Sequence, residues 1–80
     1  MKLPRDISGA DLARALTSLG YAVTRQTGSH MRLSTTKEGP HHITIPAHTP
    51  LKIGTMNSIL REVAEHHGKT REQLITELFA

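Results

Sequence analysis

The sequence contains no cysteine and no tryptophan, and Tyr21 and Phe79 are its only tyrosine and phenylalanine. Without cysteine, neither a disulfide framework nor a thiol nucleophile is available, and such a composition suits a reducing cytoplasm. No apolar run approaches the roughly 20 residues that a membrane-spanning helix needs, and no signal-peptide core is present near residue 1. We therefore expect a cytoplasmic protein that does not enter a membrane.

The shortage of aromatic side chains also limits the ways in which the chain could bind nucleic acid. Proteins that hold single-stranded bases by stacking need aromatic platforms, which two residues can hardly supply. Ten Lys and Arg against seven Asp and Glu give a formal net charge of +3, which permits an RNA partner without demanding one. If the chain binds RNA, backbone and shape contacts must dominate.

Three segments repeat apolar residues at helical spacing and carry residues typical of helix ends. Ser8 and Asp11 have the spacing of a capping box, and so do Thr70 and Gln73. Glycines follow the first two segments, where a left-handed residue commonly ends a helix. We therefore predict helices from Ser8 to Gly20, from Ile53 or Gly54 to Gly68, and from Thr70 onward.

Between the first two predicted helices, apolar and polar residues alternate in three short runs, which is typical of strands with one buried face. The strands are expected over residues 21–26, 30–35 and 42–45, joined by turns around Gly28 and Glu38. Centring the hairpins on these two residues places four pairs opposite one another: Val23 and Leu33, Gln26 and His30, Leu33 and Ile43, and Met31 and Ile45.

This register gives the sheet an apolar inner face and a polar outer face, and a slip by one residue would bury the polar set. The inner set is expected to be Tyr21, Val23, Met31, Leu33, Ile43 and Ile45, with Arg25 nominally inward at its strand end. The outer set is expected to be Thr24, Gln26, His30, Arg32, His42 and Thr44. We predict one domain, residues 1–80, with an α+β two-layer sandwich in which a three-stranded antiparallel sheet has its helices on one face. Double-stranded-RNA-binding domains share this arrangement.

Four short segments carry a resemblance that goes further than the fold. They are Gly20-Tyr21, residues 25–30, residues 45–48 and residues 54–60. Together, in this order and spacing, they resemble the HicA family of small bacterial toxins, also called YcfA-like, over nearly the whole chain. The resemblance implies a toxin of a type II toxin-antitoxin system: an mRNA interferase with a fold like a double-stranded-RNA-binding domain, held inactive by a HicB-type antitoxin protein.

The catalytic histidine of the family corresponds to His30, and the preceding Gly28 and Ser29 match as well. RNA cleavage needs a group that accepts the proton of the 2′-hydroxyl and a group that donates a proton to the leaving 5′-oxygen. An imidazole titrates near neutrality and can do either job. We therefore expect His30 to act as general acid or base in mRNA cleavage, although a histidine on a strand is more often an ordinary surface residue.

Two arginines flank this histidine in the sequence. Arg32 shares the predicted outer face with His30 and could stabilise the charge that develops on the scissile phosphate. Arg25 could do the same, although its predicted direction is inward. Ser29 could donate a hydrogen bond to phosphate or simply shape the turn, and Gly28 is expected to adopt a positive φ.

His42 and Lys37 complete the set of candidate RNA contacts. His42 is predicted on the same face as His30, where it could be a second proton-transfer group. Lys37 lies in the second predicted turn and could contact the RNA backbone. A solvated surface charge is the simpler interpretation of a lysine in a turn.

Six histidines raise the alternative of a metal site, but their spacing argues against one. There is no cysteine, and no helical segment carries two histidines at i and i+4. His66 and His67 are neighbours, about 100° apart on a helix, and are not expected to converge. We expect neither metal nor cofactor. The competing function is a non-catalytic double-stranded-RNA-binding module, which would bind by shape and phosphate contacts.

Overall fold

The fold is described from a computed structural model, which covers residues 3–4 and 6–79. Its helices and strands follow the predicted order, and the strands form one antiparallel sheet in the order β1-β2-β3. The elements are α1 (Gly9–Ala15), the 3-10 helix η1 (Leu16–Leu19), β1 (Ala22–Thr27), β2 (His30–Thr35), β3 (His41–Pro46), α2 (Ile53–His66) and α3 (Arg71–Phe79). The predicted α+β class with a three-stranded sheet is confirmed.

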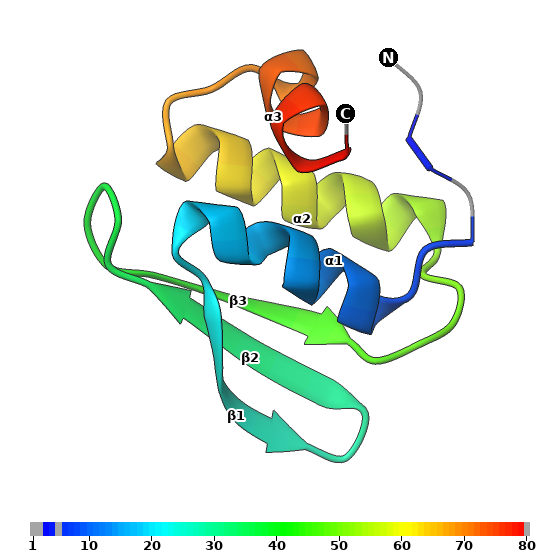
Figure 1. The fold of residues 1–80 in the computed structure, drawn as a ribbon. Coiled ribbons are helices and arrows are strands. Elements are labelled where there is room, and N and C mark those ends of the chain that lie inside the picture. The colour runs from blue at the N-terminus through cyan, green and yellow to red at the C-terminus, as the bar shows by residue number, and fades with distance from the viewer. Residues whose placement is uncertain (1–2, 5, 80) are drawn as a thin grey trace.

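The helices form a layer on one face of the sheet (Figure 1). Both α1 and α2 contact β3, and α3 packs against α2 on the side away from the strands (Figure 1). The core between the layers contains these fully buried side chains, among others: Leu12, Leu16, Leu33, Ile45, Met56, Leu60 and Val63. Their spacing along each helix is the amphipathic repeat seen in the sequence. No helix among the described residues is long and apolar enough to cross a membrane.

The predicted helix ends are present in the structure. The Ser8 hydroxyl accepts a hydrogen bond from the Asp11 amide at 3.0 Å, and the Asp11 carboxylate accepts one from the Ser8 amide at 3.2 Å. Thr70 and Gln73 form the same reciprocal pair at the start of α3. Gly20 ends the first helical segment with φ +82°, in the left-handed region that glycine adopts without strain.

The predicted strand register is confirmed in part. Leu33 lies opposite both Val23 and Ile43, and Met31 lies opposite Ile45, as expected. The predicted pairing of Gln26 with His30 is wrong. A β-bulge between Val23 and Arg25 inserts one extra residue into β1, so that every later residue of this strand moves by one position.

Unlike the other residues of the predicted inner set, Val23 remains 49% exposed. Val23 pairs with Leu33, which is fully buried, so it does lie on the expected face of the sheet. However, β1 is an edge strand, and every one of its residues is exposed. The helices lie nearest to β3, and β1 is the strand farthest from them (Figure 1).

Candidate functional site

His30 is the first residue of β2 and is exposed at the mouth of the β1–β2 hairpin. It lies opposite Thr27 on one side and Pro46 on the other. The turn before it contains Gly28, whose φ of +56° confirms the expected positive value. A Cβ atom at Gly28 would meet no neighbour, so the glycine is required by the backbone conformation and not by crowding.

Two backbone hydrogen bonds connect this turn, through the segment after β3, to the start of α1. The amide of Ala47 donates to the carbonyl of Ser29 at 2.6 Å, which ties the turn to the end of β3. The amide of Gly9 donates to the carbonyl of His48 at 3.0 Å, which ties the same segment to the start of α1. The carbonyl of Ser29, directly before His30, is therefore tied to the end of β3. Segments 27–30 and 46–48 meet although they are distant in the sequence.

The bulge in β1 changes the position of Arg25. It was predicted to point inward, but it lies directly opposite Arg32, and paired residues of antiparallel strands share a face. That face is the outer one, because Arg32 alternates with the buried Met31 and Leu33. Within the described residues, neither guanidinium has a hydrogen bond or an ion pair. Arg32 lies two positions along β2 from His30, which corresponds to roughly 7 Å between their Cα atoms. Arg25 lies opposite Arg32, so both guanidinium groups are unneutralised charges near His30.

Beyond the arginines, the outer face carries a group of polar side chains that are hydrogen-bonded to one another. The Ser34 hydroxyl hydrogen bonds with His42 Nδ1 at 2.6 Å and with the Thr24 hydroxyl at 3.2 Å. His42 lies opposite Ser34, and Ser34 is four positions along β2 from His30, which corresponds to roughly 13 Å. His42 therefore lies further along the outer face from His30 than the two arginines do.

Lys37 and Ser29 differ in their relation to this face. Lys37 lies in the turn between β2 and β3, at the end of β2 opposite to His30. Its carbonyl hydrogen bonds with His66 Nε2 at 3.1 Å, so the turn is held against the end of α2. Ser29 directly precedes His30, and the structure thus brings Ser29, but not Lys37, close to the candidate catalytic residue.

The sequence model of the HicA toxin of bacterial toxin-antitoxin systems matches residues 9–64. The chain belongs to the HicA toxin family. Neither curated proteins nor solved structures give a match. The resemblance to double-stranded-RNA-binding domains therefore stays a prediction. Membership of the family implies an antitoxin as partner, and the matched stretch contains His30 and both arginines of the outer face.

A cluster of four rings in this HicA family member was missed from the sequence. The Tyr21 hydroxyl hydrogen bonds with His41 Nδ1 at 2.7 Å and with His67 Nε2 at 3.1 Å. His66 stacks on His41, with ring centroids 4.4 Å apart. The expectation that His66 and His67 do not converge is wrong, because their ring centroids lie 4.8 Å apart at the end of α2. The useful signal was that Tyr21 was predicted on the inner face and that His41 directly precedes His42, which was predicted on the outer face.

Burial shapes the acid-base chemistry of this cluster. Desolvation raises the pKa of Tyr21 to about 12, and the nearby Glu62 carboxylate acts in the same direction. Desolvation lowers the pKa values of His41 and His67, and repulsion from His66 adds to both shifts. Among the described residues, no three His, Cys, Asp or Glu side chains are arranged to hold a metal ion. Burial therefore favours the neutral forms of Tyr21, His41 and His67.

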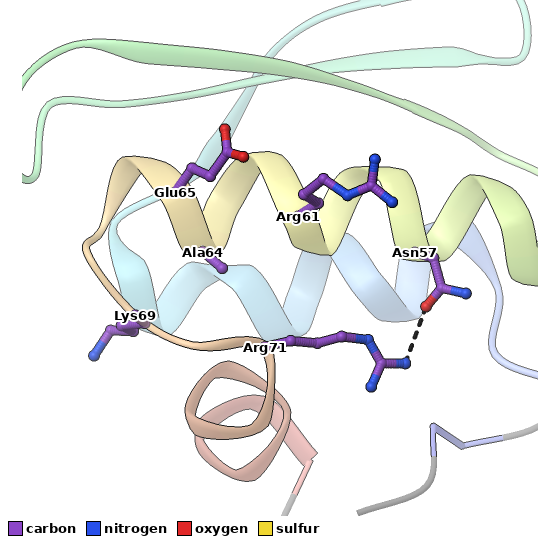
Figure 2. Close-up of a pocket in the computed structure, with 6 residues that line it drawn as sticks. All are labelled: Asn57, Arg61, Ala64, Glu65, Lys69 and Arg71. Carbon is purple, nitrogen blue, oxygen red and sulfur yellow. Dashed lines mark hydrogen bonds between the residues drawn. The ribbon is translucent and has the colours of Figure 1, made fainter.

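A surface hollow of about 540 Å³ lies between α2 and the start of α3 (Figure 2). In it, Arg71 Nη2 donates a hydrogen bond to Asn57 Oδ1 at 3.0 Å, and this bond joins the two helices. The hollow contains none of the predicted site residues, and α3 lies outside the matched stretch of the family. It is lined by Asn57, Arg61, Ala64, Glu65, Lys69 and Arg71. The outer face of the sheet therefore remains the candidate functional site.

Proposed function

We propose that this HicA family member is a metal-independent endoribonuclease that cleaves mRNA, with His30 as general acid or base. The single observation that carries the proposal is the placement of Arg25 opposite Arg32, on the face to which His30 belongs. An exposed imidazole beside two unneutralised guanidinium groups suits proton transfer at a phosphodiester. The family assignment supports a toxin, and the geometry supports a phosphate-binding site.

The chemistry would be a transesterification within the RNA. The 2′-oxygen attacks the adjacent phosphorus, a 2′-O–P bond forms, and the P–O5′ bond breaks. One proton leaves the 2′-hydroxyl and another reaches the departing 5′-oxygen, so the products are a 2′,3′-cyclic phosphate and a 5′-hydroxyl end. His30 would carry one of these transfers, and Arg25 and Arg32 would stabilise the extra negative charge of the transition state.

The test is cleavage of a labelled mRNA in EDTA by the parent protein, His30→Ala and a matched control, His48→Ala. His48 is exposed in the loop after β3, and within the described residues its side chain makes no hydrogen bond. We expect the parent and His48→Ala to cut and His30→Ala to lose at least about 100-fold in rate. Loss of cleavage on adding EDTA would overturn metal independence, and equal cutting by all three proteins would overturn the role of His30.

The end groups of the products test the mechanism separately. A cyclic phosphate and a 5′-hydroxyl are expected, whereas a 5′-phosphate end would contradict attack by the 2′-hydroxyl. If neither the parent nor His30→Ala cuts RNA but both bind it, the non-catalytic double-stranded-RNA-binding module becomes the better interpretation. Such a module would lose affinity steeply with added salt.

We further propose that a HicB-type antitoxin silences the protein by covering His30. This is the most direct form of inhibition, because His30 is exposed and supplies the proposed proton transfer. In the complex, the imidazole protons of His30 should lose solvent access, as followed by NMR. Full access of solvent to His30 in an inhibited complex would show that the antitoxin acts elsewhere.

A further inference from the structure

The outer face of the sheet carries a second polar group beyond the residues that the proposed chemistry uses. Thr24, Ser34 and His42 come from three different strands and are joined by hydrogen bonds of 3.2 Å and 2.6 Å through the Ser34 hydroxyl. The Thr24 hydroxyl also donates to the carbonyl of Arg32 at 3.3 Å. The group is therefore built into the sheet, directly beside the arginine pair.

The bulge in β1 creates this arrangement together with the arginine pair. It places two consecutive residues, Thr24 and Arg25, against the single residue Arg32. Arg25 consequently faces Arg32, while Thr24 reaches Ser34. Bulges often redirect side chains next to active sites. This bulge sets the positions of both Arg25 and Thr24 on the outer face.

The three side chains differ in chemistry from the rest of the face. Arginine binds phosphate through charge and a fork of donors, whereas the hydroxyls of Thr24 and Ser34 both donate and accept hydrogen bonds, and the His42 ring adds a nitrogen at Nε2. Base edges and ribose hydroxyls present the same mixture of donors and acceptors. Along β2, the face thus presents His30 first, then the arginine pair, and then the hydrogen-bonded group of Thr24, Ser34 and His42.

The position of this group fits a neighbouring nucleotide. Ser34 lies roughly 13 Å along β2 from His30, with Arg32 between them. Within the described residues, Nδ1 of His42 is engaged by Ser34, and its Nε2 has no partner and is left for a ligand. No tyrosine, phenylalanine or tryptophan of the described residues lies on this face, so we expect recognition here to depend mainly on hydrogen bonds.

We infer that Thr24, Ser34 and His42 form a nucleoside subsite, which recognises the base edge of the RNA nucleotide that neighbours the two flanking the scissile phosphate. This inference rests on the proposed ribonuclease function, and it assigns the subsite a role in substrate selection. Contacts to bases carry sequence information, whereas contacts to phosphate mainly position the strand. Sequence preference would then come from these three residues rather than from Arg25 and Arg32.

The experiment compares the parent with Ser34→Ala, which removes the central hydroxyl, and with Ser34→Thr, which keeps it. Thr44→Val is the matched control, because Thr44 is exposed on the same face and its hydroxyl has no partner within the described residues. Binding is measured on a 2′-O-methylated oligonucleotide, which cannot be cleaved, and steady-state cleavage is measured on the corresponding RNA and on a dinucleotide substrate.

We expect Ser34→Ala to weaken binding of the oligonucleotide and to raise the KM of the corresponding RNA roughly three- to tenfold, the range for loss of one hydrogen bond, with kcat unchanged. The dinucleotide should be cleaved as by the parent, since it does not reach the subsite. Ser34→Thr should restore most of the affinity, and Thr44→Val should behave as the parent. Equal effects on both substrates, or no effect on either, would overturn the subsite.

Salt dependence separates a nucleoside contact from a phosphate contact. Ser34→Ala should leave the slope of log affinity against log salt concentration unchanged. Arg32→Gln should make this slope smaller by the amount that corresponds to about one phosphate contact. A smaller slope for Ser34→Ala would mean that the group binds phosphate, which contradicts the proposal. If the parent binds but does not cut, and Ser34→Ala still weakens binding, the ribonuclease function fails while the subsite stands.

Discussion

Arg25 lies directly opposite Arg32 across the β1–β2 pair, and a bulge in β1 places it there. Like charges facing one another across two strands destabilise a sheet. Within the described residues, no carboxylate pairs with either arginine, so the sheet alone gains nothing from the arrangement. A polyanion bound over the pair would gain from both charges, which is the physical reason for assigning the outer face to RNA.

Replacing Arg25 by Gln should therefore raise stability and lower activity. The free energy of unfolding should increase by roughly a few tenths of a kcal/mol as the repulsion is removed. The value of kcat/KM for RNA should fall at least about tenfold, because one stabilising charge is lost at the phosphate. Urea unfolding and cleavage kinetics measure the two effects. Arg61→Gln, an exposed arginine on α2, is the matched control and should change neither.

Two helical glycines should respond to alanine with opposite signs. A Cβ on Gly9 would overlap the backbone carbonyl of Pro46, so Gly9→Ala must push α1 away from β3. Gly54 has no atom within 4 Å of such a Cβ, and Gly54→Ala should stabilise α2 by roughly 0.5–1 kcal/mol. We expect Gly9→Ala to destabilise by at least about 2 kcal/mol. Equal shifts in the urea midpoint for both variants would contradict the close approach of α1 to β3.

The histidine cluster should make the fold sensitive to acid. The pKa values of His41 and His67 are lowered in the folded state from 6.5, chiefly by desolvation, so the unfolded chain binds more protons below that pH. Stability is therefore complete above pH 6.5 and is lost as the pH falls through this value towards the lowered pKa values. Urea unfolding between pH 7.5 and about pH 5 measures the loss.

Matched variants identify the groups responsible for the acid sensitivity. Asn at position 41 and Gln at position 67 offer a hydrogen-bonding atom near Nδ1 and Nε2, respectively, without titrating. The double variant His41→Asn/His67→Gln should therefore flatten the pH dependence, whereas His48→Gln should keep it. An unchanged slope in the double variant would assign the acid sensitivity to other groups.

Tyr21 offers a direct spectroscopic test of the same cluster. It is the single tyrosine of a chain without tryptophan, so phenolate absorbance reports this side chain alone. The folded protein should titrate with a pKa of about 12, against 10.0 for the free group. Stability should be complete below pH 10 and be lost as the pH rises towards 12, because the unfolded phenol ionises first. Titration of the folded protein near 10.0 would mean that the ring is solvated.

Local sequence signals were sufficient for most of the fold. The capping boxes at Ser8 and Thr70, the left-handed Gly20 and the alternation in residues 30–35 each depend on neighbours a few residues apart. Their positions could therefore be predicted correctly. The pairing of Leu33 with Ile43 followed as well, since a short turn fixes the register of a hairpin.

The bulge could not be predicted in the same way. No local residue pattern marks it, and a single extra residue moved Arg25 from the inner to the outer face. The exposure of Val23 had a similar origin, because it depends on how far the helices extend over an edge strand. The sequence could therefore name Arg32 as a partner of His30 but could not place Arg25 correctly.

The sequence by itself determined the helices, the strands, the family and the candidate residue His30, because each of these depends on short-range patterns. Only the tertiary structure decided which side chains share a surface. It brought Arg25 to Arg32, joined Thr24, Ser34 and His42, and gathered His41, His66 and His67 around Tyr21. These groupings join residues of different strands and helices, and such proximity is set by packing and register, which no local pattern encodes.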